Sequence, residues 1–526
     1  MDYKSYSGGT SLKIIYDLGY KTINIFWRIL FALTLYFAWT SPNIILGDNS
    51  TFGTSTTWLT TYAIIAAIIL VTSLVLFQKV KNFFYFIFIK NQYITAPLLF
   101  IIIIILQILF VYYVHPVSGF DAGMLHYAAV NHKHVLEPNV AAYYSLNQNN
   151  LPITLLMRWI IVQTGHSSWM FFDYTTLVLV DISAILNILS IAIVKRKSLG
   201  IAIYVHCAWL LFFLSIIMPY TDAWVLPFVS LYILCYCIMA KKSIHFTFKV
   251  IAAVLFGLAI ILAYFIKPSA IIPVIAIVII EILSLMIRKI NFFNIHLIQI
   301  ILLLTVIGGV SLTTYKITSD AIKEQKYIKI QSWRSIPAIH FMSMGVYGTG
   351  GYNAKQALEM AVLQTKKQKT EYSKKMLFKR LKQLGAFGYL KFIIKKQGNN
   401  TADGTFGWLQ EGHFFRENQK PTTKTISGKL KNFIFLYGRN IADFRFMAQT
   451  WWIFTLSIIA LGYEKWKFRD FLKLSLVGGF LFLLLFEGGR SRYIIQYLPI
   501  ILLLATISFT PAIARTKKII AWARKD

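Results

Sequence analysis

The sequence predicts an all-α protein that crosses a membrane many times. Of its 526 residues, 57% are hydrophobic and only 14% are charged, whereas soluble domains have about 45–50% apolar and about 25% charged residues. The apolar residues form long runs, and a membrane-spanning helix needs about 20 of them. Lys and Arg gather in alternate loops between these runs. The chain is too apolar to be disordered, and the runs exclude a nucleic-acid-binding protein despite the formal net charge of +32.

About twelve apolar segments are the expected transmembrane helices. They are residues 23–39, 58–78, 93–114, 169–194, 200–218, 224–240, 248–266, 269–287, 296–315, 448–463, 472–486 and 493–510. No small-residue cleavage pattern follows the first run, so we interpret it as a first transmembrane helix and not as a cleaved signal peptide. All three cysteines lie in apolar runs, which argues against a disulfide framework.

The distribution of Lys and Arg predicts that both termini are cytoplasmic. Cations are concentrated in the loops around 79–90, 195–197, 241–249 and 465–473 and in the tail from Arg515, and cytoplasmic loops of membrane proteins carry this excess. The short loops on the opposite side carry only Lys133, Lys267, Arg490 and Arg492. We therefore expect a plasma-membrane protein with its longer loops outside the cell.

Three regions are expected along the chain. Residues 1–315 form a transmembrane core that includes a first outer loop at 115–168, in which residues 151–164 are too short to span and should lie as a helix in the outer interface. Residues 316–447 form an extracytoplasmic soluble insertion, α or α/β, with 24 Lys/Arg against 8 Asp/Glu. Residues 448–526 form the last transmembrane helices and a basic cytoplasmic tail.

Carboxylates occur in two outer turns. Asp121 lies in HPVSGFDAGMLHYAA after the third span, and Asp222 lies in PYTDAW between the fifth and sixth spans. A carboxylate at this position can act as a general base towards an acceptor hydroxyl. The alternatives are that Asp121 is a helix N-cap and that Asp222 only stabilises its turn.

Cations occur in two further outer turns. Lys267 lies in AYFIKPSAIIP, and Arg490, Arg492 and Tyr493 lie in FEGGRSRY. Lys and Arg both bind phosphate oxygens, so these residues are candidates to contact a lipid phosphate. The alternatives are a snorkelling lysine and the anchoring of a helix end. Carboxylates and phosphate-binding cations at one membrane face indicate transfer from a phospholipid-like donor.

Within the spans, ionisable residues are rare. Away from the span ends, the exceptions among Asp, Glu, Lys and Arg are Arg28, Asp181 and Glu281, each of which should face the helix bundle because exposure to lipid is costly. Asp181 and Glu281 are either structural hydrogen-bonding groups between helices or, in a transporter, part of a substrate path.

Other polar residues are candidates for sugar or acceptor binding. The glycine-rich segment HFMSMGVYGTGGYN allows either close approach to a ligand or a flexible loop. Aromatic and acidic residues suit sugar binding, and the candidates are Tyr144, Asn149, Asn150, Trp408, Glu411 and His413. His132 and His134 could ligate a metal, but no Cys or carboxylate cluster accompanies them. No cofactor is assigned, and a divalent metal stays the disfavoured alternative.

Five segments in order resemble the GT-C superfamily of integral-membrane glycosyltransferases. They are FDAGMLHYA, YYSLNQNNLPITLL, MPYTDAW, YFIKPSAIIP and EGGRSRYIIQYLPIILLLA. The most similar branch contains bacterial aminoarabinose transferases and protein O-mannosyltransferases. More narrowly, the chain resembles a Gram-positive family of membrane glycosyltransferases that includes exosortase-associated forms. Residues 316–447 show no resemblance outside that narrow family.

The resemblance implies a polyprenyl-phosphate sugar donor and inversion at the anomeric carbon. It implies that Asp121 is the catalytic carboxylate, that Asp222 is a second acid, and that Lys267 and the Arg492–Tyr493 pair contact the donor phosphate. Many relatives have a second carboxylate beside the first, whereas Ala122 follows Asp121 here. This difference argues against a paired-carboxylate metal site.

The predicted function is therefore sugar transfer to a hydroxyl of a wall polymer, surface glycan or surface protein at the outer face of the membrane. A lipid-linked sugar flippase or transporter is the main alternative, and it would need essential charges at mid-membrane. A glycan polymerase would share the outer site. A structural subunit would tolerate substitution in all the outer turns.

Overall fold

The computed structural model describes residues 10–286, 295–411, 414, 420–464 and 466–523. In these ranges the protein is helical almost throughout, which confirms the all-α fold. The only strands there are β1 (Asp48–Asn49) and β2 (Thr54–Ser55), an antiparallel pair in the loop after the first helix.

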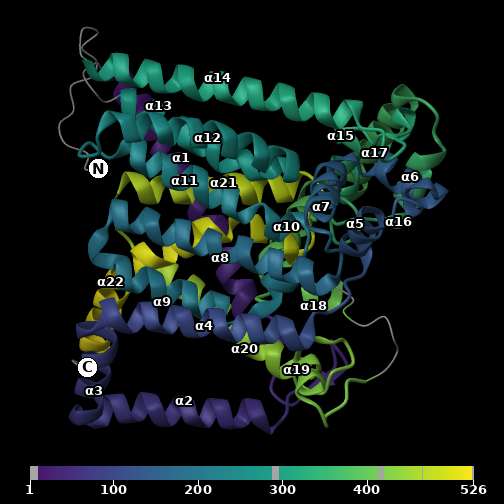
Figure 1. Ribbon diagram of the computed structural model, residues 1–526. Coiled ribbons are helices and arrows are strands. Elements are labelled where there is room, and N and C mark those ends of the chain that lie inside the picture. The colour runs from purple at the N-terminus through teal and green to yellow at the C-terminus, as the bar shows by residue number, and fades with distance from the viewer. Residues whose placement is uncertain (1–9, 287–294, 412–413, 415–419, 465, 524–526) are drawn as a thin grey trace.

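Ten helical stretches in the described ranges are long and apolar enough to cross a membrane. They run side by side in one bundle (Figure 1). These stretches lie in α1 (Thr10–Trp39), α2 (Trp58–Leu76), α4 (Gln92–Val114), α8 (Trp169–Val194), α10 (Thr221–Trp224) with α11 (Leu226–Ala240), α12 (Phe246–Ile266), α13 (Ile272–Met286), α14 (Ile295–Glu324), α20 (Ile441–Leu461) and α22 (Leu498–Ala523).

Two further expected spans lack that length or apolarity but still cross the bundle. The span at 200–218 is divided into α9 (Leu199–Leu210) and the 3-10 helix η6 (Phe213–Ile217). The span at 472–486 lies in α21 (Lys467–Leu485), whose first turns carry four charged residues. Helices α8 and α20 finish at one end of the bundle, whereas the elements α10 and α22 start at the other end. The segments between them, α9 with η6 and α21, therefore run from one end of the bundle to the other. The chain thus makes about the twelve passes that the sequence predicts.

The charged start of α21 is buried by pairing within the bundle. Lys467 donates a hydrogen bond to Glu281 at 2.6 Å, and Tyr236 donates to the same carboxylate at 2.7 Å. Lys473 forms an ion pair with Asp470 at 2.9 Å. Glu281 is therefore a structural link between helices, which is one of its two expected roles. Hydropathy alone does not predict that α21 enters the bundle, because it counts the charges of α21 but not their partners.

The other two ionisable residues within spans differ from each other. Asp181 is buried, with 7% of its surface exposed, as expected. Arg28 is exposed on α1, so the expectation that it faces the bundle is wrong. An arginine can extend its long side chain along a helix towards the membrane boundary and keep its charged end in a polar environment.

One end of the bundle carries a cap of short helices together with the long helix α17, which Figure 1 shows on the right. The cap consists of α5 (Phe120–Val130), α6 (Pro138–Leu146), α7 (Leu151–Thr164), α15 (Ala338–Met344), α16 (Ala354–Val362), α17 (Lys366–Thr401), α18 (Trp408–Glu411) and α19 (Ile426–Ile434). The separate short helix expected at 151–164 is confirmed as α7. At the opposite end, α1 begins, α22 ends and α3 (Gln78–Tyr85) joins α2 to α4.

Short 3-10 and π turns connect these elements. They are η1 (Pro42–Ile44), η2 (Phe86–Lys90), η3 (His134–Leu136), η4 (Gln148–Asn150), η5 (Arg196–Ser198), η7 (Pro268–Ile271), η8 (Ser332–Arg334) and η9 (Ser491–Tyr497). Two of them matter for the site, because η7 follows Lys267 and η9 contains Arg492 and Tyr493.

The segment 316–447 packs closely on the transmembrane core. Its long helix α17 bends at Gly385, which has φ 61° and interrupts the helical backbone. After the bend, Gln397 donates a hydrogen bond to Thr34 of α1 at 3.0 Å, and both residues are buried. The second half of α17 is therefore part of the wall between the core and the cap, and the domain boundaries assigned from sequence stay a prediction.

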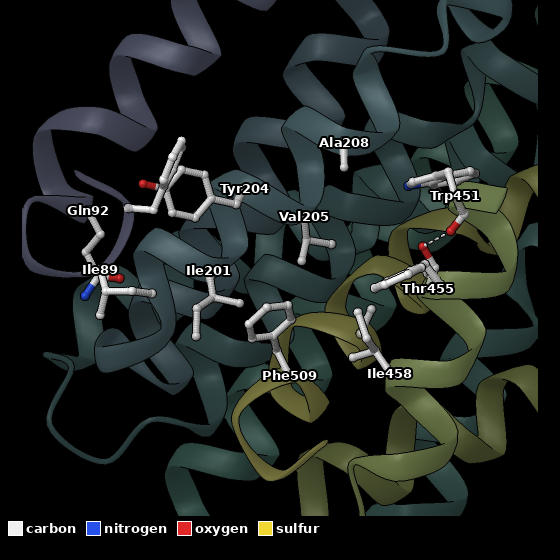
Figure 2. A pocket seen from close by; sticks show the side chains of 13 residues that line it. Ile89, Gln92, Ile201, Tyr204, Val205, Ala208, Trp451, Thr455, Ile458 and Phe509 are labelled. Carbon is white, nitrogen blue, oxygen red and sulfur yellow. Dashed lines mark hydrogen bonds between the residues drawn. The ribbon is translucent and has the colours of Figure 1, made fainter. Parts of the chain in front are cut away.

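An apolar cavity of about 330 Å³ lies on a lateral face of the bundle between α9, α20 and α22. Figure 2 shows Tyr204 and Val205 of α9 opposite Ile458 and Phe509. None of the candidate site residues lines this cavity. Its lining is mainly apolar, with Gln92, Tyr204 and Thr455 among the polar exceptions, and it contains no charged side chain.

Candidate functional site

The candidate residues from four separate turns between the spans meet at the capped end of the bundle. Asp121 lies in the first turn of α5, Asp222 in α10, Lys267 just before η7, and Arg492 in η9. These elements are far apart in sequence. Their side chains nevertheless form one network of hydrogen bonds, ion pairs and cation–π contacts.

Asp121 is an accessible carboxylate held by three donors. Its Oδ1 accepts a hydrogen bond from the Tyr143 hydroxyl at 2.8 Å. Its Oδ2 accepts from the Tyr220 hydroxyl at 3.2 Å and from Arg492 at 3.3 Å. The side chain is still 29% exposed, so a substrate group can reach it.

The helix-capping interpretation of Asp121 is wrong. Gly119 occupies the N-cap of α5 without any side-chain cap, and Asp121 lies inside the first turn. The preceding residue, Phe120, has φ 46°. A positive φ is uncommon for a bulky residue and persists only where surrounding structure enforces it, often at functional sites.

Asp222 and Lys267 form a buried ion pair. Lys267 Nζ donates to Asp222 Oδ1, and the side chains are only 12% and 1% exposed, respectively. The Lys267 ammonium also lies over the ring of Tyr493, 5.3 Å from its centroid. Asp222 therefore does more than stabilise its turn, and Lys267 does not snorkel into solvent.

Arg492 occupies the centre of the network. Its guanidinium lies 5.6, 5.5 and 5.1 Å from the ring centroids of Tyr220, Trp408 and Tyr493. Its Nε lies 3.2 Å from Glu411 Oε2, at an angle that does not make a hydrogen bond. An arginine presents a flat array of donors that fits phosphate oxygens, and the aromatic rings fix the plane of this one.

Two further carboxyls lie beside the arginines. Glu411 pairs with Arg490 at 3.3 Å, and burial raises the pKa of the Glu411 carboxyl. Glu487 accepts a hydrogen bond from the Tyr493 hydroxyl at 2.8 Å, and burial raises its pKa as well. Both carboxyls are thus more easily protonated than ordinary surface glutamates.

Asn149 and Asn150 belong to the site through hydrogen bonds. Asn150 Nδ2 donates to the Tyr143 hydroxyl at 2.6 Å, while its Oδ1 accepts from the Tyr220 hydroxyl at 3.4 Å. Asn149 donates to the same Oδ1 at 3.2 Å. Burial raises the pKa of both tyrosines well above the usual value, so they stay protonated donors to Asp121.

Tyr144 lies outside the network, although it is adjacent to Tyr143. Its buried hydroxyl shares a hydrogen bond with Thr154 at 2.7 Å, and its ring packs in a small apolar cluster with Val135, Val140 and Leu151. Successive residues on a helix point about 100° apart, so only one of the two can face Asp121. The structure therefore brings Tyr143 and Tyr220 to Asp121, and it does not bring the sequence candidate Tyr144 there.

The remaining candidates divide into three groups. Trp408 and Glu411 are part of the site, as the contacts with Arg492 show, and His413 lies outside the described residues. No group of three or more His, Cys, Asp or Glu residues that could hold a metal occurs in the described part of the chain. His134 instead contacts Glu137 at 3.2 Å and stacks on Tyr127.

Asp403 organises the loop that precedes Trp408. Its carboxylate accepts hydrogen bonds from the backbone N–H groups of Thr405 and Gly407, each at 2.8 Å. It also accepts from Asn43 at 2.8 Å and from Ser491 at 3.3 Å. Asp403 thus joins the loop that carries Trp408 to η1 and to the start of η9.

Besides Arg492 Nε, two buried polar atoms of the site have no hydrogen-bond partner within the described ranges. They are Asp222 Oδ2, an acceptor, and Trp408 Nε1, a donor. Buried polar atoms without partners are uncommon and costly. A bound ligand with hydroxyl groups could supply partners for both.

Comparison with known families gives a match over nearly the whole chain. A family model described as "Conserved hypothetical integral membrane protein" matches residues 15–513. The chain belongs to this family. The match includes every site residue named above. No curated protein and no solved structure matches the chain.

The family description names an integral membrane protein and no activity. It agrees with the ten apolar helical stretches and supports association with a lipid bilayer. The more specific resemblance to GT-C glycosyltransferases stays a prediction.

Proposed function

We propose that this family member is a membrane glycosyltransferase that moves a sugar from a polyprenyl-phosphate donor to a hydroxyl of a cell-surface acceptor. One observation carries the proposal. An accessible carboxylate, Asp121, lies in direct contact with Arg492, beside the Asp222–Lys267 pair, at one end of a transmembrane bundle. A base and phosphate-binding cations are the groups that such a transfer requires at the surface of a bilayer.

In the proposed reaction the acceptor oxygen attacks the anomeric carbon, and Asp121 takes the proton of the acceptor hydroxyl. The bond between the anomeric carbon and the phosphate oxygen breaks, and the polyprenyl phosphate leaves with the electron pair. A single displacement of this kind inverts the anomeric carbon. The Tyr143 and Tyr220 hydroxyls fix the orientation of the carboxylate.

The donor phosphate would bind by exchanging partners within the ion pairs. Arg492 contacts Asp121 and Glu411 in the structure. A phosphate that takes over the Arg492 contacts releases Asp121 from its cation, and a carboxylate without a cationic partner is a stronger base. Donor binding would thereby activate the base, and Lys267 would stabilise the charge that develops on the leaving phosphate.

The direct test is a transfer assay with the purified full-length protein in nanodiscs. A panel of polyprenyl-phosphate sugars is supplied with wall polymers, surface glycans or peptides, and products are read by mass spectrometry. Asp121→Asn should reduce transfer by about 10² to 10⁴-fold, the usual contribution of a general base. Membrane insertion and donor binding should survive. Asp48→Asn, at an exposed carboxylate on the outer β1–β2 hairpin, is the matched control.

Near-normal transfer by Asp121→Asn contradicts the proposal. The transporter would be indicated if the protein moves a lipid-linked sugar across the membrane of proteoliposomes, and if this movement persists in Asp121→Asn but is lost when Asp181 is substituted. Use of a lipid-linked oligosaccharide alone would indicate the polymerase, and tolerance of substitution at Asp121, Asp222, Lys267 and Arg492 would indicate a structural subunit.

A further inference from the structure

We propose that Lys396 and Asn400 of α17 are positioning residues that hold Arg490 and Arg492 in the geometry that binds phosphate. They act on residues 487–492, which we call the arginine turn, and on the glycine-rich residues 345–351, which we call the glycine loop. The inference rests on the proposed function in one respect, the assignment of the two arginines to the donor phosphate.

Lys396 ties three segments together with one ammonium group. Its Nζ donates hydrogen bonds to the carbonyl oxygens of Gly345 at 2.7 Å, Leu484 at 3.0 Å and Phe486 at 2.6 Å. The residue is fully buried, with 0% of its surface exposed. An ammonium has three protons to donate, so this one is satisfied by backbone alone at the junction of α17, the glycine loop and the end of α21.

Asn400 continues the contact one turn later. Its Oδ1 accepts a hydrogen bond from the backbone N–H of Gly489 at 2.6 Å, and Asn400 is also fully buried. The N–H of Gly488 donates to the carbonyl of Gly350 at 2.9 Å. Two successive amides of the arginine turn are therefore fixed immediately before Arg490.

The glycines permit this close approach. A Cβ at Gly350 would lie 2.5 Å from Lys396 Cε, and a Cβ at Gly345 would lie 2.4 Å from the Phe486 carbonyl oxygen. A Cβ at Gly489 would lie 2.4 Å from the Thr349 carbonyl oxygen, and φ at Gly489 is +69°. The glycine loop thus packs its backbone against the arginine turn, whereas the sequence suggested a ligand or a flexible loop.

The arrangement connects the arginines to the transmembrane core. We call the contacts of Lys396 and Asn400 with these two segments the clamp. Neighbouring Gln397 is hydrogen-bonded to Thr34 of α1, so the clamp is anchored in the bundle. Two arginines that bind one phosphate must keep their donors in register, and this depends on the backbone that carries them. Loss of the clamp should therefore weaken phosphate binding because Arg490 and Arg492 are less well oriented, although neither Lys396 nor Asn400 contacts the phosphate itself.

The protonation of Lys396 provides a distinctive readout. Burial lowers the pKa of Lys396 to about 7, while the nearby Glu487 carboxylate acts in the opposite direction. The other charged or titratable groups on the segments around it are Arg490 and Arg492 on the arginine turn, Tyr347 in the glycine loop, Tyr352 directly after that loop and Lys395 on α17. A neutral amine has two protons to donate, so one carbonyl loses its partner when the pH rises through about 7.

The test measures binding of decaprenyl phosphate to the full-length protein in nanodiscs between pH 6 and 8.5. Lys395→Met, at an exposed neighbour, is the matched control, and every comparison is made at the same pH so that ionisation of the probe cancels. The control should bind like wild type. Lys396→Met should bind about tenfold more weakly at pH 6, and the gap should narrow as the pH rises. Equal affinities at pH 6 would overturn the inference.

Hydrogen exchange separates this inference from the proposed function. The amides of Gly488 and Gly489 should exchange faster in Lys396→Met than in Lys395→Met, with no ligand present. Faster exchange in a protein that does not bind the probe would support the clamp and contradict the donor-phosphate assignment. Unchanged exchange would overturn the clamp. If Lys396→Met does not fold, Asn400→Ala removes only the bond to Gly489 and should show the same effects at that amide.

Discussion

The buried Asp222–Lys267 pair gives the sharpest quantitative prediction. Lys267→Met removes the cation but keeps most of the side-chain volume. It leaves Asp222, which is 1% exposed and already has one oxygen without a partner, as an uncompensated carboxylate. Unit charges about 4 Å apart interact by about 4 kcal/mol at an effective dielectric constant of about 20. Breaking a buried pair on one side costs about 3–5 kcal/mol.

We therefore expect Lys267→Met to lower the free energy of unfolding by about 3–5 kcal/mol. The double variant Asp222→Asn/Lys267→Met should recover most of this loss, because a buried pair and a well-packed neutral replacement are often nearly equal in stability. The assay is a double-mutant cycle, measured by steric trapping in bicelles. Lys133→Met, at an exposed lysine of the cap, should change stability by less than about 0.5 kcal/mol.

A coupling energy below about 0.5 kcal/mol would refute this reasoning, because residues in one ion pair should couple by about 0.5–3 kcal/mol. The same result would mean that Asp222 and Lys267 do not act as a unit. Donor binding separates the role of Lys267 in binding from its role in folding. If Lys267→Met loses donor binding, and the double variant regains stability but not binding, Lys267 contributes to binding directly.

Two more predictions concern stability and dynamics. Burial lowers the pKa of His340 in α15 from 6.5 to about 4, so the unfolded chain binds a proton at a higher pH than the folded chain does. Stability should fall by up to about 3 kcal/mol as the pH drops from 6.5 to about 4, and His340→Gln should show a shallower fall in a pH series of unfolding midpoints. Asp443 accepts hydrogen bonds from the Thr57 N–H, the Thr57 hydroxyl and the Thr60 hydroxyl at 2.5–2.8 Å. Asp443→Asn should therefore raise the rate of amide hydrogen exchange at residues 57–60. Unchanged exchange there would mean that contacts other than those with Asp443 hold the start of α2.

Much of the architecture follows from the sequence because the bilayer imposes it. Apolar runs of a fixed length located the helices, and both segments that fail the length or apolarity test still cross the bundle. The division of one into α9 and η6, and the buried charges at the start of α21, depend on partners elsewhere in the chain. Glu281 illustrates this, since Lys467 lies far from it in sequence.

The site was only partly predictable. Asp121, Asp222, Lys267, Arg490, Arg492 and Tyr493 stood out because charges are scarce in the short loops opposite the basic ones, and the structure brings all of them together. Tyr143 and Tyr220 were missed because an aromatic residue near an interface is unremarkable in sequence. The choice between Tyr143 and Tyr144 depends on the rotation of α6, which packing determines.

The sequence by itself determined the all-helical membrane architecture and the polar residues in the turns at the ends of the spans, because both follow from the cost of placing polar groups in lipid. The tertiary structure alone decided which of these residues meet. It brought α17 back into the core, so that Lys396 and Asn400 reach the arginine turn, and it showed that the glycine loop packs backbone against backbone. Such contacts join segments distant in the chain, and local sequence patterns do not record which carbonyls a buried lysine reaches.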